Sequence, residues 1–182
     1  MTLLGRDALC RSYDRSAATY DDRFRAHQEL KYAAMLGDET ALGRRPWLDL
    51  GCGTGLLQPY LAARDIDGSG LVGLDFSAAM LALARQRRLA VARGDADALP
   101  FRDATFGTVL AFTVLRIVPD PEVEVRTLAE IARVLEHGGV FVLTVLQANH
   151  DDTLMHRLHA AGLRTEAMRP CGQDLGYRCV RA

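Results

Sequence analysis

Three glycines, Gly51, Gly53 and Gly55, alternate with other residues directly after the apolar run 46–50. Glycine has no Cβ, so it adopts positive φ angles and lets a ligand approach the main chain closely. The next residues, 56–63, return to a helical pattern, and the free N–H groups at the start of a helix can face such a turn. The pattern therefore predicts a strand, a glycine turn and a helix that hold a ligand largely through backbone groups.

An acidic residue follows the second apolar run of the chain. Asp75 comes directly after the run 70–74 and lies 20 residues beyond Gly55. A carboxylate at this position can accept hydrogen bonds from the two neighbouring hydroxyls of a ribose. Capping of the next helix is the alternative role, but Ser77 is the better N-cap for a helix over 78–87. The pattern therefore favours a ribose bound by Asp75.

A second acid follows the third apolar run, 89–92. Asp95 lies where an adenine would sit beside the ribose, and its carboxylate can accept from the adenine amino group while the N–H of Ala96 donates to the ring. A turn-forming aspartate is the alternative interpretation. Taken together with Asp75, this pair favours an adenosine.

These residues lie in a chain that alternates between strand and helix patterns. Apolar runs cover 46–50, 70–74, 89–92, 108–114 and 140–146, with helical patterns over 56–63, 77–87 and 121–135. This alternation predicts a doubly wound, mostly parallel α/β sheet with helices on both faces. A helix over 151–161 and two final runs joined by a hairpin-length segment, 170–174, predict a seventh, antiparallel last strand.

The N-terminal segment differs from this pattern. Residues 1–42 are rich in polar side chains and carry apolar residues at mixed helical spacings, so we expect two helices that form an N-terminal cap. Residues 46–146 would form the ligand-binding core, and 147–182 a C-terminal helix and hairpin. The length of 182 residues suits one domain.

Charge and composition exclude several classes. The net charge is −1 without a basic block, so we expect no nucleic-acid partner. Lys31 is the only lysine and lies away from the glycine turn, which excludes a P-loop nucleotide triphosphatase. The four cysteines match no metal or redox motif, so we expect reduced thiols and no bound metal. Neither a signal peptide nor an apolar stretch of about 18 residues is present, so we expect a cytoplasmic protein without a membrane partner.

Four blocks occur in a fixed order, and together they resemble the class I S-adenosylmethionine-dependent methyltransferases. Each block alone is shared with other nucleotide-binding proteins, whereas the set at these separations is specific. The resemblance covers about residues 46–146 and implies a Rossmann-like fold, S-adenosylmethionine as cofactor and a small-molecule methyl acceptor. The blocks are 49–55, 73–77, 94–101 and 133–139.

The resemblance also implies a role for each matching residue. The glycine turn would contact the methionine part of the cofactor, Asp49 its amino end and Asp75 its ribose. Phe76 and the pair Asp95 and Ala96 would contact the adenine, while N-terminal tyrosines would fold over the cofactor. The implied cofactor contacts are Tyr20, Asp49, Gly51, Cys52, Gly53, Gly55, Asp75, Phe76, Asp95, Ala96 and Phe112.

The end of the fourth strand bears on the acceptor. Residues 112–115 read Phe-Thr-Val-Leu, whereas the family members that methylate bases or amides carry an acid, asparagine or serine before Pro-Pro-Tyr. Base and amide methylation are therefore disfavoured. Arg116 follows this strand, where it would either clamp an acidic group of the acceptor or form an ion pair with Asp120 or Glu122.

Methyl transfer from a sulfonium requires alignment and exclusion of water more than covalent help. A general base is therefore optional. If one acts, the candidates are His150, His27 and the cap tyrosine Tyr13, because a base must lie within hydrogen-bond distance of the acceptor. A solvated surface position is the alternative for both histidines.

Two other functions stay open at this point. An NAD-dependent oxidoreductase would explain Asp75, but its G-x-G-x-x-G pattern needs a glycine at Leu56. The other is a non-catalytic module that binds S-adenosylmethionine or S-adenosylhomocysteine, because a fold does not fix a function. Either a monomer or a homodimer is expected.

Overall fold

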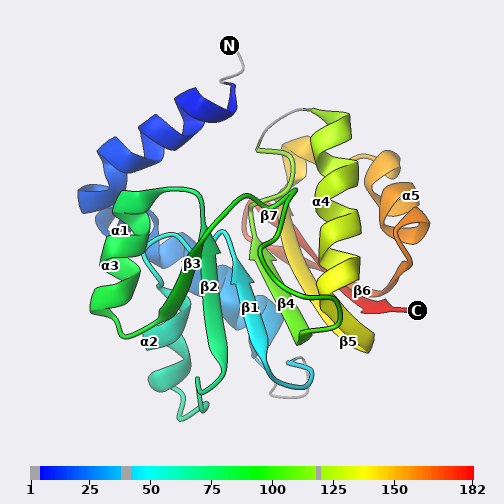
Figure 1. Cartoon of the computed structure of the whole chain (residues 1–182), viewed down its shortest axis with the longest axis horizontal. Helices are drawn as coiled ribbons and strands as arrows, with labels where there is room; N and C mark the ends of the chain where they lie inside the picture. The colour runs from blue at the N-terminus through cyan, green and yellow to red at the C-terminus, as the bar shows by residue number, and fades with distance from the viewer. Residues whose placement is uncertain (1–4, 38–41, 118–119) are drawn as a thin grey trace.

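Seven strands form one sheet, in a computed structural model that describes residues 5–37, 42–117 and 120–182. The strands are β1 Trp47–Leu50, β2 Leu71–Asp75, β3 Ala90–Arg93, β4 Phe106–Phe112, β5 Leu135–Leu146, β6 Leu163–Cys171 and β7 Asp174–Arg181. Their order is β3-β2-β1-β4-β5-β7-β6 (Figure 1). Only β7 runs against the others, paired antiparallel with both β5 and β6. The predicted mostly parallel sheet with an antiparallel last strand is confirmed.

Helices cover both faces of this sheet, as predicted. The helices are α1 Arg6–Leu36, α2 Leu57–Ala62, α3 Ala78–Gln86, α4 Pro121–Val134 and α5 Asp152–Ala160, with a short 3-10 turn, η2, at Gln147–Asn149. Leu128 of α4 belongs to one buried apolar cluster, which α5 shares, and Leu61 of α2 belongs to a second, which α1 and α3 share. Because successive side chains of a strand point to opposite faces, Val109 of β4 enters the first cluster and Leu110 the second.

The N-terminal segment corrects one prediction. It forms a single helix of 31 residues, α1, and not two helices. Residues Tyr32 and Leu36 in its last turns are buried in the second apolar cluster, so this end of α1 belongs to the core and not to a cap. Its earlier part is held by polar contacts, since Asp21 accepts a hydrogen bond from Thr54 Oγ1 at 2.6 Å. The predicted cap also includes residues 1–4 and 38–41, which lie outside the described ranges.

The predicted helix starts follow from side-chain capping. Ser77 Oγ accepts from the N–H of Met80 and begins α3. The Asp120 carboxylate accepts from the N–H of Glu122 at 2.9 Å, and Pro121 occupies the first position of α4.

Two details of α4 differ from the prediction. The sequence His-Gly-Gly at 137–139 predicts the end of this helix, but the helix ends at Val134 and the chain passes directly into β5, so these residues lie inside that strand. The spacing of Val125, Leu128, Ala132 and Leu135 predicts an apolar stripe on this helix, but Val125 is 52% exposed. In the described part of the chain, no helix is both long and apolar enough to cross a bilayer.

Candidate functional site

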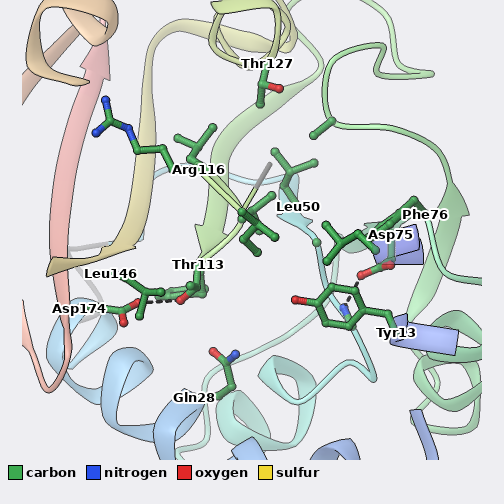
Figure 2. A pocket seen from close by; sticks show the side chains of 18 of the residues that line it. Tyr13, Gln28, Leu50, Asp75, Phe76, Thr113, Arg116, Thr127, Leu146 and Asp174 are labelled. Atoms are coloured by element: carbon green, nitrogen blue, oxygen red, sulfur yellow. Dashed lines mark hydrogen bonds between the residues drawn. The ribbon is translucent and has the colours of Figure 1, made fainter. Parts of the chain in front are cut away.

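A cavity of about 440 Å³ lies at the carboxyl ends of β1, β2 and β4, the edge where parallel α/β sheets bind ligands. Residues at or directly after the ends of these strands form its floor, for example Gly51, Asp75 and Thr113. Side chains of α1 also line it, among them Tyr13, which lies beside Asp75, and Gln28 (Figure 2). The cavity therefore brings together the N-terminal helix and the predicted ligand-binding turns.

The glycine turn does only part of what the sequence pattern predicted. Gly51, Gly53 and Gly55 all have positive φ angles, which favour glycine. Among the described residues, a Cβ at Gly53 would meet only Tyr20, at 3.9 Å, so this backbone is open to a ligand. Gly55 does not line the cavity, and its Cβ would lie 3.1 Å from that of Ala84 in α3. Gly55 is therefore required by the packing of a helix and not by close approach of a ligand.

Asp75 joins the glycine turn to the start of α3. Its Oδ2 accepts from the N–H of Gly53 and its Oδ1 from the N–H of Ser77, both at 2.9 Å. The side chain lines the cavity but is only 6% exposed, and this burial raises its pKa against the effect of the two N–H groups. The predicted ribose-binding carboxylate thus lies at the cavity wall with a fixed orientation.

Aromatic rings stand beside Asp75. The Phe76 ring packs edge-on against Tyr13 of α1, with centroids 5.9 Å apart, and both residues line the cavity. Tyr20 lies further along α1, and its hydroxyl accepts a hydrogen bond from Gln28 Nε2 at 3.2 Å. Burial raises the pKa of Tyr13 to about 12, so this tyrosine does not ionise readily enough to act as a base near neutral pH.

Two buried oxygens lie unpaired beneath the glycine turn. Asp49 Oδ2 and Gln28 Oε1 have no hydrogen-bond partner within the described residues, and both residues line a smaller pocket together with Cys52 and Phe112. Burial, reinforced by the charge of Asp75, raises the pKa of Asp49 to about 8. Buried polar atoms rarely stay unpaired in proteins. A ligand group with N–H donors, such as the ammonium of an amino acid, would satisfy both oxygens.

The predicted adenine-edge pair, Asp95 and Ala96, also lines the cavity. The Asp95 carboxylate is 44% exposed and pairs with Arg6 at the start of α1. Arg6 also contacts Asp97, at 2.9 Å. The N-terminal end of α1 is therefore tied to the loop that the sequence predicts to hold the adenine.

The remaining catalytic candidates are placed less favourably. Arg116 lines the cavity, but its guanidinium binds Glu124 at 3.2 Å and Asp151 at 2.9 Å, and not the predicted partners Asp120 and Glu122. Its donors are thus engaged within the protein, which argues against a clamp on the acceptor.

The two candidate histidines, His150 and His27, differ in their position relative to the cavity. His150 Nδ1 lies 2.5 Å from the hydroxyl of Tyr177, and this histidine is not among the residues that line the cavity. The structure therefore does not bring His150 to the site as a base. His27 does line the cavity, from α1.

Sequence reasoning missed a polar group on the opposite side of the cavity from Asp75 (Figure 2). Lys31 of α1, Thr113 after β4 and Asp174 at the start of β7 all line the cavity and contact one another. The only available signal was that Lys31 is the single lysine in a chain whose other basic residues are arginine or histidine. Nothing local marked Thr113 or Asp174.

Comparison with known proteins adds an independent finding. A family model described as a methyltransferase domain matches residues 48–143. The chain is 37% identical over 145 residues to a phosphatidylethanolamine N-methyltransferase of Cereibacter sphaeroides, covering 75% of this chain and 67% of the relative. It is 42% identical over 104 residues to a demethylmenaquinone methyltransferase of Lactiplantibacillus plantarum, covering 52% of this chain and 42% of the relative. The chain thus spans about two fifths to two thirds of the length of these relatives.

Solved structures share the fold. A SAM-dependent methyltransferase from Aquifex aeolicus superposes with a TM-score of 0.71 at 17% identity, covering 93% of this chain and 98% of that one. The [4+2]-cyclase SpnF superposes with a TM-score of 0.60 at 27% identity, covering 81% of this chain and 59% of that one.

Proposed function

This chain belongs to the class I S-adenosylmethionine-dependent methyltransferases, and on that premise we propose that it transfers the methyl group of S-adenosylmethionine to an apolar small molecule bound in the cavity. One observation carries the proposal. The cavity that holds the predicted adenosine contacts also extends to a second set of side chains, on α1 and the β6–β7 hairpin, so it has room for an acceptor beside the cofactor.

The residues present fit this cofactor. Asp75 would bind the ribose, and Phe76 with Asp95 and Ala96 would face the adenine, since all four line one side of the cavity. Asp49 would accept a hydrogen bond from the ammonium of the methionine part, because its Oδ2 is buried without a partner in the described residues. When bound, the cofactor supplies an electrophilic methyl group.

Gln28 extends the predicted set of cofactor contacts. Its Oε1 is buried and unpaired in the described part of the chain, and it lines the same small pocket as Asp49. We therefore assign it to the ammonium as well. The two acceptors come from β1 and α1, so cofactor binding would join the helix to the sheet.

The acceptor side is largely apolar. Leu30 and Leu146 are large, exposed apolar residues that line the cavity, and exposed apolar patches of this kind often mark binding sites. Two relatives are named for the acceptors phosphatidylethanolamine and demethylmenaquinone, and both of these molecules carry apolar groups. We infer that the acceptor has an apolar body, with its reactive atom turned toward β4.

The protein would act mainly by alignment. α1 covers the cavity from Arg6 to Lys31 and would exclude water from the reacting groups. The wall beside β4, formed by Phe112 and Val114, would keep the acceptor atom in line with the methyl group.

Isothermal titration calorimetry with S-adenosylmethionine, S-adenosylhomocysteine and NAD tests the cofactor assignment. We expect binding of the first two and none of NAD. A screen with labelled methyl groups over apolar acceptors then tests transfer. Tight NAD binding without a response to the other two ligands would contradict the proposal. Cofactor binding without transfer to any acceptor would favour the non-catalytic module.

A further inference from the structure

A buried charged pair forms part of the acceptor side of the cavity. Lys31 Nζ lies 3.2 Å from Asp174 Oδ2 and donates a hydrogen bond to Thr113 Oγ1 at 2.5 Å. The Thr113 hydroxyl in turn donates to Asp174 Oδ2 at 2.6 Å. The Lys31 and Asp174 side chains are only 10% and 2% exposed, yet both residues line the cavity.

Within the described residues, this arrangement leaves hydrogen-bonding capacity of both Lys31 and Asp174 unused. A lysine ammonium has three donors, and two of them are directed at Thr113 and Asp174. Asp174 Oδ1 takes part in no hydrogen bond within the described residues, because both contacts use Oδ2. A donor and an acceptor therefore stand next to each other at the wall of a cavity that is otherwise largely apolar on this side. A hydroxyl group matches them, since it accepts one hydrogen bond and donates another.

We propose that Lys31 and Asp174 bind a hydroxyl group of the methyl acceptor, and that Asp174 is the general base for its methylation. This inference rests on the proposed methyltransferase function. The acceptor would be a neutral, apolar molecule with a weakly acidic hydroxyl, such as a phenol.

The step balances in atoms and charge. The hydroxyl oxygen forms a bond to the methyl carbon, while the bond from that carbon to sulfur breaks and its electron pair stays on sulfur. The hydroxyl proton moves to Asp174 Oδ1. The Lys31 ammonium donates to the oxygen as the O–H bond breaks and stabilises its developing negative charge.

The charges of Lys31 and Asp174 favour a neutral hydroxyl over an ammonium or an anionic acceptor. An ammonium acceptor would face the Lys31 charge, and an anionic acceptor would face the Asp174 carboxylate. Either would bring a third charge into an apolar site, where unpaired charge is costly. A neutral hydroxyl pairs with both residues and adds no charge.

Binding tests the first part of the inference. The protein is saturated with S-adenosylhomocysteine and titrated by calorimetry with 1-naphthol and with naphthalene, which lacks the hydroxyl. We expect wild type to bind 1-naphthol roughly 10-fold or more tightly than naphthalene, because the hydroxyl forms hydrogen bonds to charged groups. This preference should fall to within a few-fold in D174N. D103N, which removes a 78% exposed carboxylate outside the cavity, is the control and should keep it.

Rates test the base. We expect D174N to lower kcat/KM for 1-naphthol by roughly 100-fold or more, as for loss of a general base. 2,4-Dinitro-1-naphthol is already ionised at neutral pH and needs no base. For this anion the same variant should leave kcat/KM unchanged or raise it, because it also removes the like charge of Asp174. A merely structural role of Asp174 would lower both rates equally.

Each failure has a distinct meaning. If S-adenosylhomocysteine does not bind, the proposed function fails before this test begins. If it binds but wild type does not prefer 1-naphthol over naphthalene, the hydroxyl site is overturned and the proposed function is not. Equal losses for both naphthols in D174N, or no methylation of bound 1-naphthol by wild type, would overturn the base. If D174N does not fold, D174E, which keeps the charge but displaces the oxygens, should give the same selective loss, and an equal loss would again overturn the base.

Discussion

The two sides of the cavity are assembled in different ways. On the proposed cofactor side, Gly53 and Asp75 lie at or just after the ends of neighbouring parallel strands, and their contact is a backbone N–H to a carboxylate. On the proposed acceptor side, Lys31, Thr113 and Asp174 come from a helix, a loop and a hairpin and meet only through side chains. The first side depends on local backbone geometry, and the second on one buried pair of charges brought together by the whole fold.

Because the two sides are built differently, different substitutions should disturb each of them. A backbone-built site is disturbed by changes that add a Cβ, whereas a buried ion pair is disturbed by the removal of one partner. Four substitution experiments separate these two behaviours, and their expected effects decrease in the order given.

The largest effect is expected from Lys31→Met. It leaves the Asp174 carboxylate, 2% exposed, without its cation, and such a loss typically costs about 3–5 kcal/mol in the free energy of unfolding. Urea unfolding measures it. The double variant K31M/D174V removes both charges and should recover most of the loss. A double variant as unstable as K31M would show that the pair is not the source of the effect.

Gly51→Ala should disturb the cofactor side next most strongly. Its φ is +69°, and a Cβ would lie 2.5 Å from Val114 Cγ2, so strain and overpacking together should cost roughly 2–4 kcal/mol. Gly53→Ala is the matched control, because φ is also positive but the space is open, and only about 1–2 kcal/mol is expected. Equal costs in urea unfolding would contradict the packing argument.

Asp75→Ala should weaken binding of S-adenosylmethionine by about 1–3 kcal/mol, because a hydrogen bond to a charged group is lost. Calorimetry measures the change in Kd. D174N, which changes the other side of the cavity, should leave the Kd of S-adenosylmethionine nearly unchanged. An unaltered affinity in D75A would place the ribose elsewhere.

The fourth effect concerns pH, and it is the smallest when counted per pH unit. The ordinary pKa of aspartate is about 3.9, whereas burial raises that of Asp49 to about 8 in the fold. Between these values the folded protein keeps a proton that the unfolded chain has lost, so the free energy of unfolding should fall as pH rises from about 4 to 8, by at most ~1.4 kcal/mol per pH unit.

Asp49→Asn removes this ionisation and should flatten the slope. Urea unfolding at several pH values compares the two proteins, and only their difference matters because other carboxylates also titrate. Identical slopes would show that Asp49 does not titrate in this range.

The sequence predicted the cofactor side far better than the acceptor side, for a physical reason. Asp75 and Ser77 follow one strand within three positions, so local pattern sufficed to place them at the end of a parallel strand. Lys31 and Thr113 are 82 residues apart, and their contact depends on how α1 crosses the sheet, which no local pattern encodes. The error at α1 had the same origin, because burial of Tyr32 and Leu36 in the core continues one helix where polar spacing indicated two. The ligand contacts themselves stay predictions on both sides.

The β6–β7 turn has a consequence for protein engineering. Asp174 is the first residue of β7 and pairs in register with Leu146 of β5 and Cys171 of β6, so the turn between Cys171 and Asp174 holds only two residues. None of these residues contacts the glycine turn or Asp75 through a hydrogen bond in the described structure. Under the proposed function, exchanging residues 171–174 together with Lys31 is a compact route to new acceptor chemistry, because it replaces both charges of the buried pair and leaves β1 and β2 intact.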